Sequence, residues 1–265
     1  YFNWKGVYSM KIRHKIISRI TAIIFLAGMF SVIPLTAVAY GTYGSLTYNT
    51  YDSDGDGVYD YLTIASCAQP VTEVEIPAEI DGVPVTEIQQ YAFGGCNNLK
   101  NVIIPDRVVK IGKYAFYDCR SLKEITIPES VASIDNCAFK NCSVLETVLI
   151  KNPECEIYDS ADTIFNNLIF DEETGEDFNS INGTIYGYEN STAQAYAEKY
   201  GYNFKLFVQG DISKNDLIDL YDAIEVVKYI MKIRTFTETD KQFADFTGND
   251  AVDLHDAIEI ARTLI

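Results

Sequence analysis

The chain has 265 residues, of which 48% are hydrophobic and 22% charged, and its formal net charge is −17. This composition suffices for one or two packed domains and is not that of a disordered chain. The excess of acids excludes nucleic acid as a partner, because phosphate binding needs clustered lysine and arginine. It favours cations instead.

The N-terminal segment, residues 1–39, carries the order of a secretory signal peptide. Residues 1–9 lack an initiator and are interpreted as upstream translation, so Met10 is the expected start. A basic stretch follows, then an apolar run from Ile20 to Val38 and an Ala-Val-Ala cleavage triplet. The alternative is a membrane anchor, because the run is long enough to span. Pro34 and several hydroxyl residues interrupt it, so we expect cleavage and a secreted, extracellular chain.

Residues 40–70 are expected to form an N-terminal cap and hairpin with an acidic loop. The acids of this loop alternate as in the front half of a calcium loop. They are Asp52, Asp54, Asp56 and Asp60. The twelfth position would be Thr63, which is a poor final ligand. A hairpin between Leu46–Tyr51 and Tyr59–Ile64 fits the same residues, because Asp-Gly steps make turns. Both interpretations stay open.

Residues 71–205 contain an internal repeat of 23 residues, which relates Phe93, Phe116 and Phe139. A fixed period of this kind indicates a solenoid, in which each repeat contributes a short strand. One repeat cannot bury its apolar residues alone, so stacked neighbours must do so. An amphipathic helix from Asn190 to Tyr202 is expected to cap the open end of the stack.

The recurring I-P, G-x-x-A-F and C-x-x-L elements resemble the BspA-like leucine-rich repeats of bacterial surfaces over about residues 70 to 205. The resemblance implies a curved solenoid whose strand-lined concave face contacts proteins. Strand alternation predicts which side chains lie on that face. The candidate contact residues are Glu75, Ile103, Thr126 and Leu149. An ordinary sheet surface without a partner is the alternative.

Six cysteines in an exported chain raise the question of disulfides. Three share one repeat position and are expected to be buried thiols. They are Cys96, Cys119 and Cys142. Cys67 is expected to extend this ladder into the cap, whereas Cys137 and Cys155 have no predicted place. We expect no catalytic cysteine, because the one histidine of the mature chain, His255, lies far away in sequence.

A different repeat begins after Gly210, where residues 211–222 recur as residues 245–256 and each copy runs into an apolar helix. Oxygen donors occupy positions 1, 3, 5, 7, 9 and 12 of the calcium-loop template in both copies. The first set is Asp211, Ser213, Asn215, the carbonyl of Leu217, Asp219 and Asp222. The second set is Asp245, Thr247, Asn249, the carbonyl of Ala251, Asp253 and Asp256. Calcium prefers such hard oxygen ligands, whereas zinc does not.

Two positions depart from this template. Position 6, usually glycine, is Asp216 and Asp250, although aspartate tolerates the left-handed region better than most residues. Position 12 is aspartate, which reaches less far than glutamate. Acidic helix N-caps without a metal are the alternative interpretation.

The duplicated loop-then-helix arrangement, with no entering helix, resembles the dockerin module of cellulosomal proteins over about residues 209 to 265. The resemblance implies two calcium ions that fold the module, and a helical face that binds a cohesin domain of a scaffoldin. The positions that match this face are Leu220, Tyr221, Lys228, Leu254, His255 and Arg262. Core packing is the alternative for the two leucines. The pair Tyr221 and His255 puts a two-fold symmetric binding mode in doubt.

The expected fold class is α+β, a short leucine-rich-repeat solenoid followed by an all-α calcium-binding dockerin of paired half EF-hands. The favoured function is that of a secreted, non-catalytic cellulosome component. It would dock to a scaffoldin at the cell surface and present the solenoid to a protein or carbohydrate. A polysaccharide-degrading hydrolase, or an adhesin or inhibitor, is the alternative. The sequence contains no nucleophile elbow, phosphate loop or His-rich zinc motif.

Overall fold

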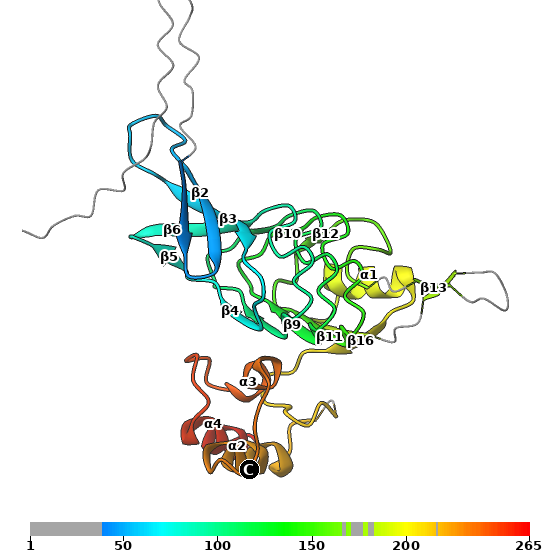
Figure 1. Cartoon of the computed structure of the whole chain (residues 1–265). Helices are drawn as coiled ribbons and strands as arrows, with labels where there is room; N and C mark the ends of the chain where they lie inside the picture. The colour runs from blue at the N-terminus through cyan, green and yellow to red at the C-terminus, as the bar shows by residue number, and fades with distance from the viewer. Residues whose placement is uncertain (1–38, 166–167, 171–176, 180–182, 216) are drawn as a thin grey trace, which may run out of the picture. The chain divides into compact units, whose positions relative to one another are not determined.

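The computed structural model describes residues 39–265 except 166–167, 171–176, 180–182 and 216. The expected signal peptide therefore lies outside the described residues, apart from the backbone of its last residue, and so does Asp216. In the described chain a β-solenoid is followed by a helical C-terminal region (Figure 1). The described helices are too short or too polar to span a bilayer.

An antiparallel N-terminal meander starts the solenoid. It consists of β1 (Ala39–Tyr43), β2 (Leu46–Tyr51) and β3 (Tyr61–Cys67). Tyr51 and Tyr61 are register partners and their rings stack at 4.9 Å. The acidic loop of residues 52–60 therefore joins the ends of a hairpin, so the two interpretations of this segment are compatible.

The first sheet of the solenoid has the order β1-β2-β3-β6-β8-β10-β12, with β5 paired to β6. Its remaining members are β5 (Glu79–Ile80), β6 (Val83–Ile88), β8 (Lys110–Ile111), β10 (Ser133–Ile134) and β12 (Glu156–Ile157). From β3 to β12 the main path of this sheet is parallel, because each repeat contributes one rung in the same direction.

The second sheet carries two of the four candidate contact residues, Thr126 and Leu149. It has the order β16-β15-β11-β9, all parallel. These strands are β9 (Glu124–Ile127), β11 (Thr147–Ile150), β15 (Thr184–Gly187) and β16 (Asn203–Leu206). Two further parallel strands, β4 (Glu73–Glu75) and β7 (Asn101–Ile103), pair with each other. A short antiparallel pair, β13 (Leu168–Phe170) and β14 (Asp177–Asn179), follows β12 in sequence.

The core between the sheets is built from the repeating residues. Phe93, Phe116 and Phe139 are fully buried, and their rings stack at 4.9 and 5.2 Å with interplanar angles of 7° and 4°. The equivalent residue of each repeat therefore meets its copy in the next rung, as the 23-residue period predicts. Stacked aromatic pairs contribute about 0.5–1.5 kcal/mol each beyond their burial.

All six cysteines are free thiols, and all except Cys67 are buried. The thiol of Cys119 lies 3.2 Å from the carbonyl of Phe93, and that of Cys142 lies 3.0 Å from the carbonyl of Phe116. Each of these thiols thus donates to the preceding repeat. The half-exposed Cys67 lies beside Cys96, whose thiol lowers the pKa of Cys67 to about 7.

Helix α1 (Thr192–Tyr200) covers the open end of the stack, within the range expected from the sequence. Ser191 caps it by accepting the N–H of Gln194, and Gly201, at φ 73°, ends it. Its inner side buries Ala193, Tyr196 and Ala197.

The C-terminal region contains α2 (Leu220–Ile230), α3 (Glu238–Ala244) and α4 (Leu254–Arg262). Buried Val226 of α2, Phe243 of α3 and Ile260 of α4 share one apolar core. The expectation that no helix enters either loop is wrong for the second loop, because α3 ends directly before Asp245. Thr237 accepts the N–H of Asp240 and Asp240 accepts that of Thr237, which together form a capping box that starts this short helix.

Candidate functional site

The two acidic loops of the C-terminal region share a left-handed turn at position 4. Position 4 is left-handed in both, with φ 58° at Lys214 and 69° at Gly248. Position 6 of the second loop, Asp250, is also left-handed at φ 62°, which is the conformation that its sequence position requires. Its counterpart in the first loop, Asp216, lies outside the described residues.

The side chains at positions 1 and 5 bond to the backbone of their own loops. Asp211 Oδ1 accepts the N–H of Asn215 at 3.1 Å, and Asp245 Oδ1 accepts the N–H of Asn249 at 3.0 Å. The amide oxygen at position 5 in turn accepts the N–H of position 7, at 2.9 Å in both loops. These matched bonds order the oxygen donors of each loop in the same way.

Position 12 places a carboxylate in the interior of each half. Asp222 and Asp256 are fully buried, although both belong to the first turn of a helix. Each accepts the N–H groups of positions 3 and 9, at 2.8–2.9 Å. Within the described residues, the hydrogen-bond partners of these carboxylates are N–H and hydroxyl groups, and none is a lysine or arginine.

A buried carboxylate is costly unless a positive charge or several donors compensate it. Position 9 adds a second negative charge, since Asp219 and Asp253 cap the N-termini of α2 and α4. Each loop therefore brings together many oxygen atoms that could bind a metal ion, and its buried carboxylate has no lysine or arginine partner among the described residues. These residues fit a hard divalent cation such as calcium.

A separate group of acids lies in the hairpin loop. Asp52, Asp54 and Asp60 each bring one carboxylate oxygen within 4.8 Å of the others, which no other three acidic, cysteine or histidine groups of the described chain do. Asp56 is not part of this group, and its Oδ1 accepts the N–H of Val58 at 2.7 Å. Hydrogen bonds from Ser53 lower the pKa of Asp60. In the C-terminal loops, neutral residues at positions 3 and 5 separate the acids.

An apolar surface runs along each of the two long C-terminal helices. Leu220 and Leu254 are 60% and 57% exposed, so neither belongs to the core. Ile224 and Ile258, one turn further along each helix, are 42% and 41% exposed. On each helix, two further side chains, polar or aromatic, lie beside the exposed leucine and isoleucine. We call the following residues the docking face: Leu220, Tyr221, Ile224 and Lys228 on α2, and Leu254, His255, Ile258 and Arg262 on α4.

On α2, a buried carboxylate holds the charged residue of the docking face in place. Lys228 Nζ lies 2.7 Å from Glu225 and 5.4 Å from the centre of the Tyr221 ring. Glu225 is almost fully buried and also pairs with Arg234. Burial raises the pKa of the Glu225 carboxyl, but hydrogen bonds from these two cations outweigh burial and hold the pKa below its usual range.

On α4, the charged residues of the docking face pair with a carboxylate that is less buried. Arg262 pairs with Glu259, which remains partly exposed, and His255 Nδ1 lies 3.7 Å from the same carboxylate. No counterpart of Arg234 pairs with Glu259 among the described residues. The two halves therefore present similar apolar residues on differently fixed charges.

The candidate contact residues of the solenoid differ in accessibility. Glu75 and Ile103 are exposed, whereas Thr126 is half-buried with its hydroxyl covered. Leu149 is fully buried, so its assignment as an exposed contact residue is wrong. It lies beside its strand partner Tyr186 in a buried cluster that also contains Phe207.

Two family models match the chain. Residues 65–188 match the BspA type leucine rich repeat region in six copies, and residues 209–265 match the dockerin type I domain. No curated protein matches the chain.

Among solved structures, a leucine-rich repeat protein from Bacteroides capillosus is 25% identical, with a TM-score of 0.42, over 47% of this chain and 91% of that chain. A leucine rich cell surface protein from Faecalibacterium prausnitzii is 26% identical, with a TM-score of 0.37, over 58% of this chain and 38% of that one. A leucine-rich repeat protein from T. pallidum is 20% identical, with a TM-score of 0.36, over 63% and 98%.

Both matched families are non-catalytic modules. A dockerin implies docking to a cohesin in a cellulosome-type assembly and binding of calcium, and a leucine-rich repeat region implies a protein-binding surface. The duplicated loops and the stacked repeats lie within the matched ranges. The chain thus combines a BspA-type leucine-rich-repeat solenoid with a C-terminal type I dockerin domain.

Proposed function

We propose that this chain is a secreted, non-catalytic component of an extracellular cellulosome-type complex. Its dockerin would bind two calcium ions and attach the chain to a cohesin of a scaffoldin at the cell surface. The single observation that carries this proposal is the duplicated loop, in which oxygen donors occur at equivalent positions and matched hydrogen bonds order them.

Calcium would be held by the two donor sets named above. When bound, it supplies the positive charge that the buried Asp222 and Asp256 lack. These carboxylates also accept backbone N–H groups at the start of α2 and α4. Binding of the ion would therefore fix the beginning of each helix, and with it the docking face.

The docking face suits a partner with a complementary apolar patch. Leu220 and Ile224 on α2, and Leu254 and Ile258 on α4, expose large side chains that the core does not use. An exposed apolar surface rimmed by charges is typical of a protein interface. Lys228 and Arg262 would form part of that rim.

We propose that the chain is divided into four segments. The segments are the upstream residues and signal peptide (1–39), the cap with its hairpin (40–70), the solenoid with its capping helix (71–205) and the dockerin (209–265). The Asp52–Asp60 loop would hold a third calcium ion. The solenoid would present Glu75, Ile103 and Thr126 to a protein or carbohydrate.

The experiment is binding of the calcium-loaded mature chain to a panel of type I cohesin domains. We expect one or more cohesins to bind, and the double variant Leu220→Ala/Leu254→Ala to bind about tenfold more weakly or less. The matched control is Leu206→Ala, another exposed leucine that lies on β16 of the solenoid. Unaltered binding of the double variant, or no binding to any cohesin, would contradict the proposal.

The alternative of a hydrolase is tested separately. Incubation of the mature chain with plant polysaccharides should release no sugar above a blank. Turnover above the blank would show a catalytic function that neither module explains.

A further inference from the structure

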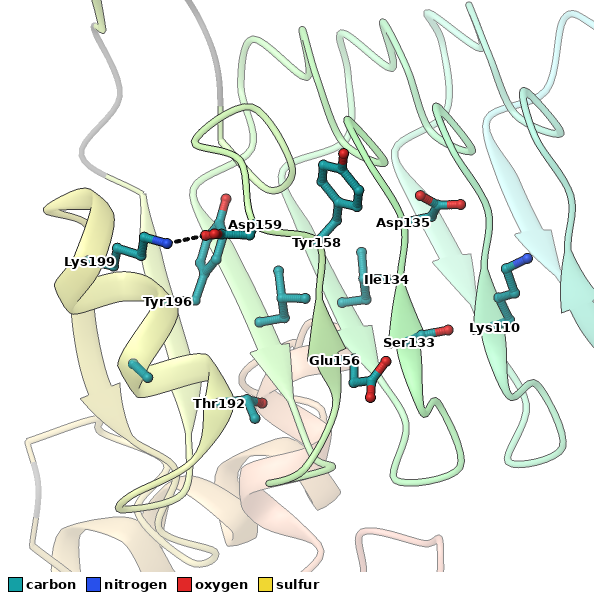
Figure 2. A pocket seen from close by; sticks show the side chains of 12 residues that line it. Lys110, Ser133, Ile134, Asp135, Glu156, Tyr158, Asp159, Thr192, Tyr196 and Lys199 are labelled. Atoms are coloured by element: carbon teal, nitrogen blue, oxygen red, sulfur yellow. Dashed lines mark hydrogen bonds and ion pairs between the residues drawn. The ribbon is translucent and has the colours of Figure 1, made fainter.

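The two sheets of the solenoid end at different rungs. The second sheet continues from β11 through β15 to β16, whereas β12 is the last strand of the first sheet. Helix α1 stands beside β12, and an open groove of about 630 Å³ lies between them (Figure 2). Grooves of this size are typical of small-ligand sites.

One wall of the groove consists of aligned polar residues. Lys110, Ser133 and Glu156 are register partners on β8, β10 and β12. Neighbouring strands lie about 4.8 Å apart, so polar groups recur along the wall at that interval. Asp135 and Tyr158 follow β10 and β12 on neighbouring rungs, and Figure 2 shows both at the same edge of the groove.

The opposite wall is fixed by contacts of its own. Thr192 Oγ1 donates to the carbonyl of Cys155 at 2.6 Å, and the Tyr196 hydroxyl donates to the carbonyl of Ser160 at 2.8 Å. Lys199 pairs with Asp159, which Figure 2 marks with a dashed line. Helix α1 is therefore held in place beside β12, and the groove does not depend on a ligand for its shape.

Several groups in the groove keep unused hydrogen-bonding capacity. Within the described part of the chain, no hydrogen bond joins the Ser133 hydroxyl or the Glu156 carboxylate to another residue. Asp135 uses one oxygen to accept the N–H of Asn136 at 2.6 Å. Tyr158 is 49% exposed, so its ring offers an apolar face beside these acceptors.

The mixture of groups limits the class of ligand. Three acids and two lysines line the groove, but both lysines are already paired, Lys199 with Asp159 and Lys110 with Glu87. The groove therefore offers hydrogen-bond acceptors, and a strong anion is not favoured. A purely apolar ligand would leave carboxylates desolvated without partners. A neutral molecule with many hydroxyl groups and an apolar face satisfies both the acceptors and the exposed ring.

We propose that the groove between β12 and α1 binds a neutral oligosaccharide, with Tyr158 as a stacking platform and Asp135 and Glu156 as acceptors for sugar hydroxyls. An extended peptide added to the edge of β12 is less favoured, because this strand has only two residues. The site is separate from the docking face and from the outer side of the second sheet, and needs no cohesin.

The test is native affinity electrophoresis of the calcium-loaded full chain in gels that contain a soluble neutral polysaccharide, namely β-glucan, xyloglucan or galactomannan. We expect retardation by at least one of them. Tyr158→Ala should weaken binding about tenfold, and Tyr158→Phe should retain most of it because the ring remains. The matched control is Tyr43→Ala, since Tyr43 is 51% exposed but lies on β1, outside the groove.

Failure of retardation with all three polysaccharides would overturn the proposal, as would equal retardation of Tyr158→Ala and Tyr43→Ala. Binding of extended peptides in the absence of sugar binding would overturn it in favour of strand addition. Because no cohesin takes part in this assay, its failure would leave the docking proposal untouched.

Discussion

Substitution of the buried position-12 carboxylates distinguishes two possible roles of Asp222 and Asp256, namely ligands of a metal ion and caps of a helix. In Asp222→Asn and Asp256→Asn, one amide oxygen remains as an acceptor at nearly the same place. The other oxygen becomes an NH₂ group that faces one of the two N–H groups, of position 3 or position 9, which in the native chain lie 2.8–2.9 Å from the carboxylate. The change removes the negative charge with almost no change in volume.

The magnitude follows from the number of bonds lost. Each substitution removes one hydrogen bond to a charged group, which costs about 1.5–3 kcal/mol of stability with or without calcium. If the loop also binds calcium, the native chain gains a further linkage term, about 4 kcal/mol at a calcium concentration of 1,000 times Kd. The variant loses that term only when calcium is present.

The assay is urea unfolding of residues 40–265 and of each variant, monitored by helical circular dichroism in excess calcium and in EGTA. We expect the destabilisation caused by Asp222→Asn to be several kcal/mol larger in calcium than in EGTA, and the same for Asp256→Asn. Equal destabilisation in the two buffers would show that these carboxylates act as caps only, and would refute the metal assignment.

Three further predictions concern the solenoid and the start of the dockerin. Phe116→Ala should lower stability by about 3–5 kcal/mol in urea, because it opens a cavity between two stacked rings; a loss below about 1 kcal/mol would contradict the ladder. Cys67, whose pKa is lowered to about 7 by Cys96, exists mainly as thiolate above that pH and mainly as thiol below it. Iodoacetamide should therefore modify Cys67 first, at a rate that falls as the pH drops through 7, and first labelling elsewhere in mass spectra would count against this. Gly210→Ala should destabilise the dockerin by about 1–3 kcal/mol in thermal unfolding, because φ is 100° and the new Cβ would lie 2.7 Å from the Phe246 ring; an unchanged Tm would argue against that strain.

The repeats were predictable from the sequence because each equivalent residue solves the same packing problem. The spacing of Phe93, Phe116 and Phe139 required a stack, and the alternation of oxygen donors required two similar loops. The end helix could be placed by its Ser191 cap and Gly201 stop. Repeat spacing, alternation and helix caps are local features of the sequence, so they can be recognised without knowing which distant residues are in contact.

The features that the sequence did not indicate depend on longer-range or weaker signals. Leu149 alternates as if exposed, but Phe207, which comes much later in the chain, shares its buried cluster. Helix α3 is only seven residues long, so its Thr237 cap was its main signal. Ile224 and Ile258 are exposed although apolar residues in helices are more often buried, so their place on the docking face becomes visible only in the structure.

The most direct test of calcium binding by the dockerin is a calorimetric titration of calcium into metal-free residues 40–265 carrying Asp52→Asn and Asp60→Asn. These two substitutions remove the separate acidic group of the hairpin loop. We predict that two equivalents of calcium bind, together with a gain in helical signal. A chain that binds no calcium while its dockerin is already folded would contradict it.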